Sequence, residues 1–485
     1  MSEIRKRTKA LAVNPLKASQ ALGASLAFLG LKNCLPMLHG SQGCTAFGKV
    51  FFVRHFREPI PLQTTAMDQL ATIMNADDNL VEGLRVISEK NQPQIIGLPT
   101  TGLSETQGSD VQRVIKTFRQ RHPQYAGVAV VPVNTPDYSG CLETGYALAV
   151  AAVIDELVPP SALAGRRHKQ VNVLASSMLT PGDAEAIKEW LEAFGLRPVL
   201  LPDIGDSLDG HLVPEETSAL TLGGTPLTEI ASLGEAVATL VIGRSLDAAA
   251  DLLKARTGVP DYRFDHLLGV DACDAFTAAL AEISGQSVPA RIERQRAQLQ
   301  DAMVDCHFMT GLLRVGIAAD ADLLLALAQF LTGVGAEVVS AIAPARAAAL
   351  VEVPASEVQI GDLEDLERAA QTFAVPLQLI VSNAHAAATA ERLGVPLLRA
   401  GFPQYDRVGG YTRTWVGYRG SRQTLFDIAN LVLGNHHDIP VHRSVFWTGT
   451  PRRFERPAGT QPTLGAGLVG HQAAADADEG RLRQR

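Results

Sequence analysis

Five cysteines, Cys34, Cys44, Cys141, Cys273 and Cys306, are the side chains of this sequence best suited to hold a soft metal. So sparse and odd a set does not fit a disulfide framework, which is dense and even in number. No two of them have the C-x-x-C spacing, which excludes zinc ribbons and thioredoxin-like redox sites. A metal bound here must therefore take its other ligands from distant loops or from another chain.

Cys44 ends the string His39-Gly-Ser-Gln-Gly-Cys44, which follows an apolar run and precedes a segment that can form a helix from Thr45 to Phe56. A thiol at a helix N-terminus meets the positive end of the helix dipole and free N–H groups, which stabilise a thiolate. Gly40 and Gly43 let the backbone approach a bulky inorganic group and donate to cluster sulfides. These features suit a metal–thiolate loop, although the residues alone fit a buried structural cysteine as well.

Two glycine patterns match nucleotide-binding motifs only in part. The stretch from Gly43 to Lys49 has the G-x-x-x-x-G-K spacing of a phosphate loop, but Val50 replaces the Ser or Thr that binds magnesium. Gly333-Val-Gly335 ends a predicted helix and does not join a strand to one. We therefore expect no nucleotide phosphate site at either pattern.

Repeated βαβ units must position these residues. Short β-branched runs alternate with polar loops and with helical segments rich in alanine and leucine, which indicates parallel sheets. The predicted strand, helix and strand ranges are 94–98, 110–121 and 127–133; 171–174, 183–194 and 198–201; 313–317, 321–331 and 336–340; and 377–381, 384–393 and 395–398. The fold class is therefore α/β, with three Rossmann-like, doubly wound parallel-sheet domains that bind ligands at the carboxyl ends of their strands.

We predict domains at residues 1–160, 166–300 and 301–455, because about 150 residues form one domain. The first boundary is the polar stretch after Pro159-Pro160, and the second lies in the charged helical stretch 291–301. Residues 456–485 are polar and aperiodic and predict a disordered tail. The densest histidine group, His436, His437 and His442, follows a helix-ending Gly-Asn pair and is interpreted as a polar turn.

Charge and hydropathy exclude two classes of function. The 43 Lys and Arg residues are scattered and outnumbered by 51 Asp and Glu residues, so the sequence does not predict a nucleic-acid-binding surface. The longest apolar runs are well short of the ~18 residues that span a bilayer, and no secretory signal follows the basic residues near the N-terminus. We expect a cytoplasmic protein.

Three strings resemble the nitrogenase molybdenum-iron protein family: Asn14-Pro-Leu-Lys-Ala-Ser19, Leu38-His-Gly-Ser-Gln-Gly-Cys44-Thr-Ala-Phe and Arg54-His-Phe-Arg-Glu-Pro59. The similarity extends over residues from about 10 to 455 and includes Gly401-Phe-Pro-Gln-Tyr-Asp406. Within this family the residues are most similar to the β-type subunit of the scaffold complex on which the iron-molybdenum cofactor matures. The resemblance implies three Rossmann-like domains and a cluster at a subunit interface.

Departures from the family pattern indicate which cluster this is. The catalytic β subunit of the family supplies three cysteines to an eight-iron cluster, and Ser19, Cys44 and Gly102 stand at those positions here. Since serine is a poor iron ligand and glycine is none, the resemblance implies a [4Fe-4S] cluster shared with the partner, with Cys44 as this chain's ligand. Cys141 takes the position of a serine near the large cluster, so it is expected near the metal or as a packed thiol.

The resemblance also implies partners. They are a NifE-type α subunit in a heterotetramer, NifB as donor of the cofactor precursor, the NifH iron protein, and the nitrogenase molybdenum-iron protein as acceptor. The complex would hold the iron-molybdenum cofactor precursor, and this chain is not expected to be an enzyme by itself. The alternatives are a divergent nitrogenase β chain, a subunit of the related light-independent (proto)chlorophyllide reductases, and a metal-free protein that binds small molecules.

Overall fold

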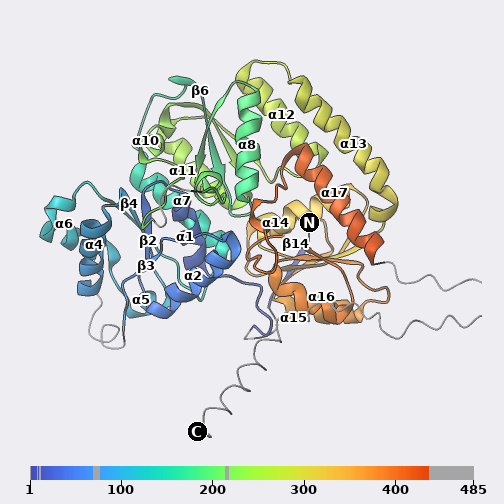
Figure 1. Ribbon diagram of the computed structural model, residues 1–485, viewed down its shortest axis with the longest axis horizontal. Helices are drawn as coiled ribbons and strands as arrows, with labels where there is room; N and C mark the ends of the chain where they lie inside the picture. The colour runs from blue at the N-terminus through green and yellow to red at the C-terminus, as the bar shows by residue number, and fades with distance from the viewer. Residues whose placement is uncertain (1, 8, 10–11, 69–76, 213–217, 436–485) are drawn as a thin grey trace, which may run out of the picture. The chain divides into compact units, whose positions relative to one another are not determined.

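The computed structural model describes residues 2–7, 9, 12–68, 77–212 and 218–435, whose strands form three sheets flanked by helices (Figure 1). Every strand pair among these residues is parallel. Parallel strands need crossover connections, which the helices provide. The predicted α/β class with several parallel-sheet domains is confirmed.

The first sheet has the order β3-β2-β4-β5 and separates two hydrophobic cores. Because side chains alternate along a strand, Ile95 packs with the core of α1 and α7, whereas Ile96 packs with that of α4 and α6. The strands are β2 (Cys34–Leu38), β3 (Gln63–Thr64), β4 (Ile95–Pro99) and β5 (Ala129–Val133). The helices are α1 (Gln20–Leu29), α2 (Gln42–Phe56), α4 (Asp77–Asn91), α5 (Gly102–Gln107), α6 (Val111–Arg121) and α7 (Leu142–Leu157).

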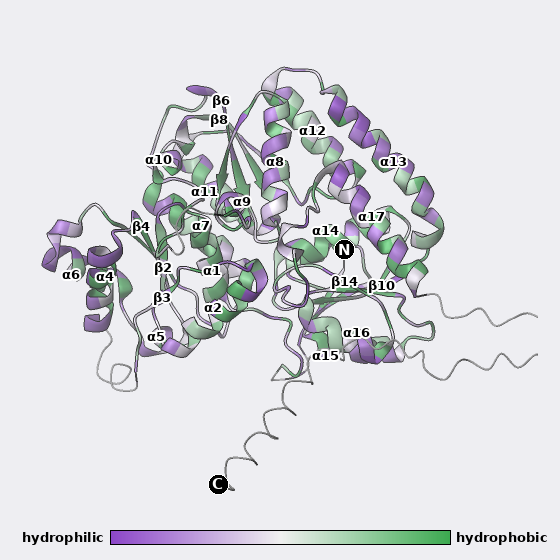
Figure 2. Ribbon diagram, viewed as in Figure 1, coloured by the Kyte–Doolittle hydropathy of each residue, from purple (hydrophilic) through white to green (hydrophobic). Residues whose placement is uncertain are grey.

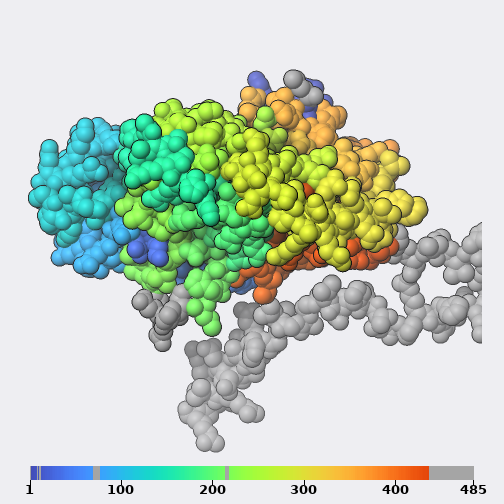
Figure 3. Space-filling model, turned by 90° about the horizontal axis from the view of Figure 1, so that it is seen from above, coloured from blue at the N-terminus to red at the C-terminus, as the bar shows by residue number. Residues whose placement is uncertain are grey.

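The second sheet has the order β7-β6-β8-β9; its inner strand β8 is hydrophobic, whereas β6 begins with polar residues (Figure 2). The strands are β6 (Arg167–Ala175), β7 (Arg197–Leu201), β8 (Ala236–Ile242) and β9 (Asp261–Phe264). The helices are α8 (Pro181–Ala193), α9 (Ile204–Ser207), α10 (Leu227–Ile230), α11 (Asp247–Thr257), α12 (Val270–Ser284) and α13 (Ala290–Thr310). Helix α13 leaves a long outer face exposed (yellow in Figure 3) and runs without a break through the domain boundary predicted at 300.

The third sheet has the order β1-β12-β11-β10-β13-β14. Its strands are β1 (Glu3–Arg5), β10 (Arg314–Ala318), β11 (Glu337–Ala343), β12 (Glu357–Ile360), β13 (Leu379–Ser382) and β14 (Leu397–Arg399). The helices are α14 (Ala321–Gly333), α15 (Leu363–Thr372), α16 (Ala387–Leu393) and α17 (Gly417–Gly434). Strand β1 pairs with β12, so the first residues of the chain belong to the last sheet. Strand β1 has only three residues, and two of them are charged. Because so short a segment shows no strand pattern, the sequence did not indicate this pairing.

Most predicted strands and helices lie within about three residues of the observed ones. The predicted tail at 456–485 and the histidine group at 436–442 lie outside the described residues. Among the residues that are described, no helix is both long and apolar enough to cross a bilayer.

Candidate functional site

Cys44 is the third residue of α2, whose N-cap is Ser41. Its thiol is exposed, and Ser41 Oγ lies 3.5 Å from Cys44 Sγ. The helix begins at Gln42, three residues before the predicted start at Thr45, so Gly43 to Lys49 is helical and cannot form a phosphate loop. The exposed thiol therefore lies at a helix N-terminus, as the sequence predicted.

The other four cysteines are buried. Burial raises the pKa of each of these thiols, namely Cys34, Cys141, Cys273 and Cys306. In the absence of a metal these buried thiols stay protonated and unreactive. Cys44 is therefore the one cysteine of the chain with an exposed thiol.

The loop before Cys44 packs on the loop that carries Gly102. The hydroxyls of Thr101 and Ser104 donate to the carbonyl oxygen of His39, at 3.0 and 2.9 Å. A Cβ atom on Gly40 would lie 2.4 Å from Thr101 Oγ1, so only glycine allows this approach. Gly40 thus sets the spacing between the Cys44 loop and the Gly102 loop.

Asp137 connects the Gly102 loop to the segment that leads to Ser19. The backbone N–H of Gly102 donates to Asp137 Oδ2 at 3.3 Å, and Lys17 Nζ donates to the Asp137 carbonyl oxygen at 3.3 Å. Burial raises the pKa of Asp137 and lowers the pKa of Lys17. Neither residue was predicted from the sequence as part of the site, although a Pro-Asp-Tyr turn is a signal for a loop carboxylate.

Ser19 is the N-cap of α1, and its Oγ accepts from the N–H of Leu22 at 3.3 Å. Gln20 Nε2 donates to Thr144 Oγ1 at 3.0 Å, next to Cys141, the N-cap of α7. A Cβ atom on Gly48 of α2 would lie 2.9 Å from Leu22 Cδ2. Helix α1 therefore begins beside α2 and beside the Cys141 turn.

These contacts bring the predicted site residues to one edge of the first sheet. The Cys44 loop follows β2, the Gly102 loop follows β4, and the Cys141 loop follows β5. The three strands are parallel neighbours, so their carboxyl ends meet at the edge where α/β sheets bind ligands. Cys141 itself is 3% exposed, and its thiol bonds to Asp320.

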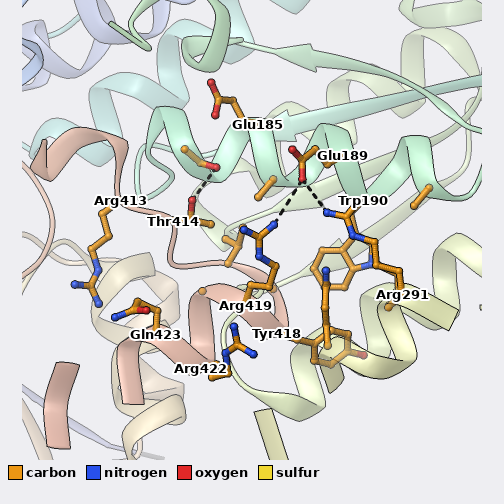
Figure 4. Close-up of a pocket in the computed structure, with 18 residues that line it drawn as sticks. Glu185, Glu189, Trp190, Arg291, Arg413, Thr414, Tyr418, Arg419, Arg422 and Gln423 are labelled. Atoms are coloured by element: carbon orange, nitrogen blue, oxygen red, sulfur yellow. Dashed lines mark hydrogen bonds and ion pairs between the residues drawn. The ribbon is translucent and has the colours of Figure 1, made fainter. Parts of the chain in front are cut away.

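A hollow of about 480 Å³ lies between α8, α13 and α17, away from this sheet edge, and contains none of the predicted site residues (Figure 4). The carboxylate of Glu189 lies between the guanidinium groups of Arg291 and Arg419, at 3.9 and 4.0 Å. These side chains are mostly exposed, so the pairs are weak. Tyr418 at its edge is buried and packs against Trp190, with 5.6 Å between the ring centroids.

A family model of nitrogenase component 1 type oxidoreductases matches residues 19–433. The chain belongs to the nitrogenase component 1 family. It is similar to the nitrogenase iron-molybdenum cofactor biosynthesis protein NifN of Klebsiella pneumoniae, with 45% identity over 444 residues that cover 92% of this chain and 96% of the relative. A protein of the same name from Nostoc sp. is 47% identical over 425 residues, 88% of this chain and 94% of the relative.

Solved nitrogenase structures have the same fold. A chain described as nitrogenase Cp1 at pH 6.5 superposes with a TM-score of 0.82 at 31% identity, covering 88% of this chain and 94% of that one. A second chain, from nitrogenase Cp1 at pH 5, gives a TM-score of 0.63 at 14% identity, which shows the fold alone. The family assignment from the three sequence strings is thus confirmed over nearly the full length of both relatives.

Proposed function

We propose that this chain is the NifN-type β subunit of a NifEN scaffold on which the iron-molybdenum cofactor of nitrogenase matures. The observation that carries the proposal is the reduced set of thiols at the sheet edge: Cys44 is exposed there, while Ser19 and Gly102 lack thiols. The relatives named for iron-molybdenum cofactor biosynthesis support it. A scaffold subunit needs no complete large cluster, whereas a catalytic β chain does.

We further propose that Cys44 binds a [4Fe-4S] cluster shared with a NifE-type partner in a heterotetramer. The residues fit such a group, because an exposed thiolate at a helix N-terminus is stabilised by the dipole and by free N–H groups. Four-iron clusters take four cysteine ligands, so a chain that offers one exposed thiol needs a partner for the rest. Gly40 and Gly43 would border the cluster, and Ser19, Gly102 and Cys141 would form the surrounding wall.

Exposed apolar side chains on α2 support a partner chain at this face. Phe47 and Val50, which are three residues apart and therefore neighbours on the helix surface, are 71% and 52% exposed. Tyr138, on the loop after β5, is also exposed. Contiguous exposed apolar groups mark interaction surfaces, and an obligate partner commonly covers over ~2,000 Å².

Replacing Val50 with aspartate should weaken capture of the α-type partner by at least about tenfold, because an unpaired charge would be buried in the interface. Co-purification of tagged variants from an anaerobic host measures this. Val375→Asp is the matched control, since Val375 is also exposed but lies outside this face. Equal yields of partner with both variants would contradict the proposed interface.

The wild-type chain without its partner should aggregate, and a stable isolated monomer would count against an obligate partner.

The proposed function predicts a specific defect in cells that lack this chain. They should make a molybdenum-iron protein without its cofactor, and added isolated cofactor should activate that protein. Cofactor formation should also need the other proposed partners. These are NifB as donor of the precursor, NifH, and the molybdenum-iron protein as acceptor of the cofactor. Normal cofactor formation without the chain would overturn the proposal. Substrate reduction by this chain in place of a nitrogenase β subunit would favour the catalytic alternative.

A further inference from the structure

The carboxyl groups of Glu143, Asp320 and Asp322 meet where helices of the three sheets come together; Asp320 is partly buried and the other two are buried. Glu143 lies in the first turn of α7, and Asp320 and Asp322 lie at the N-terminus of α14. Glu143 and Asp322 are each 1% exposed.

Each carboxyl group accepts hydrogen bonds from a different part of the chain. Glu143 Oε2 accepts from the backbone N–H of Asp322 at 2.7 Å, which ties the first unit to the third. Asp322 in turn accepts from Ser245 of the second unit, from its N–H at 3.2 Å and its Oγ at 2.6 Å. Asp320 bonds to the thiol of Cys141. One chain of hydrogen bonds thus connects the N-termini of α7 and α14 with the 3-10 turn Arg244–Leu246 that precedes α11.

Cations on neighbouring segments do not neutralise this cluster. Lys17 bonds to the carbonyl oxygen of Asp137, and Arg244 pairs with Glu352 at 2.5 Å and with Asp265 at 3.3 Å. Asp247, at the start of α11, adds a further negative charge that acts on Asp322. The groups that face Glu143, Asp320 and Asp322 are therefore other carboxyls, a thiol, hydroxyls and backbone N–H groups.

Burial and mutual repulsion make it costly to ionise all three carboxyls together. Burial raises the pKa of Asp320 and of Asp322 to about 6, and burial with the charges of Asp322 and Asp320 raises the pKa of Glu143. The buried hydroxyl of Ser176 is without a hydrogen-bond partner, and a Cβ on Gly243 would lie 2.5 Å from both Ser176 Oγ and Asp322 Oδ2. Ser176 thus adds a polar group near Asp322 and no charge.

We propose that this carboxyl cluster is a proton-dependent latch that holds the three parallel-sheet units together. Raised carboxyl pKa values mean that the closed state holds protons more tightly than an open one. The stabilisation is complete below the ordinary carboxyl pKa near 4 and is lost as the pH rises through about 6. Repulsion between ionised carboxyls then opens the junction. The latch does not depend on the proposed function.

Hydrogen exchange in the full chain, purified as it exists with its bound partners, tests the latch. Protection of the amides of Asp322 and Ser245, corrected for intrinsic exchange, should fall by about tenfold between pH 5 and pH 8. In Glu143→Gln the amide oxygen still accepts the bond but cannot ionise, so protection should change less than about threefold. Glu143→Ala lacks the acceptor and should be poorly protected at both pH values.

Glu156→Gln is the matched control, because Glu156 lies on the same helix but is exposed. It should keep the full pH dependence of the wild type. Equal wild-type protection at pH 5 and pH 8 would overturn the latch. So would a Glu143→Gln variant whose protection falls with pH as steeply as that of the wild type.

Discussion

Replacing Cys44 with alanine should remove most of the cluster iron from the purified complex and abolish its electron paramagnetic resonance signal. Cys44 is the single exposed thiol of the chain, so no other cysteine can take its place. The cluster would keep only its ligands from the partner and an open iron site. Iron per complex, measured under strictly anaerobic conditions, gives the result directly. The fold should be unaffected, because surface substitutions usually change the free energy of unfolding by no more than ~0.5 kcal/mol.

Two further variants separate ligation from general effects of cysteine loss. Cys306→Ala removes a buried thiol on α13, which does not belong to the first sheet. This variant should leave the iron content unchanged. Cys44→Ser offers an oxygen in place of sulfur and should retain less iron than the wild type. Unchanged iron and an unchanged resonance signal in Cys44→Ala would show that this residue is not a ligand.

The sequence predicts which residues lie at the sheet edge, because the patterns that indicate strands and helix starts are short stretches of neighbouring residues. The strands before Cys44, Gly102 and Cys141 are short apolar runs, and parallel strands place their carboxyl ends together. The string around Cys44 also predicts a helix N-terminus, which α2 confirms to within three residues. What these residues bind is a separate question, and it stays a prediction.

The sequence could not predict contacts between distant segments. Asp137 joins two loops through one backbone N–H and one lysine, a pairing that has no spacing rule. Glu143 accepts a bond from Asp322, 179 residues away, and neither residue differs in sequence from a solvent-exposed acid at a helix start. Such partners depend on how the sheets pack against one another, which periodicity does not encode.

Replacing Gly145 with alanine should lower the free energy of unfolding by about 3 kcal/mol or more, although alanine is the better helix former. Helices α1 and α7 cross with their backbones in contact. A Cβ on Gly145 would lie 1.9 Å from the carbonyl oxygen of Gln20, and a Cβ on Gly23 would lie 1.8 Å from that of Leu142. Backbone atoms cannot move aside as side chains do, so the helices must separate. Thermal and urea unfolding of the purified complex measure the loss.

Gly333→Ala is the matched control, because Gly333 is also helical but an added Cβ would have no atom within 4 Å apart from its chain neighbours and the nearby backbone of its own helix. It should be neutral or slightly stabilising, by up to ~1 kcal/mol. Equal stability of the two variants would show that α1 and α7 tolerate separation. Ser19 is the N-cap of α1 and Cys141 is the N-cap of α7, so Gly145→Ala should also lower the iron content. Cys44→Ala should lower the iron content without lowering stability. That contrast distinguishes the residue that binds the cluster from the helix crossing that holds the surrounding loops in place.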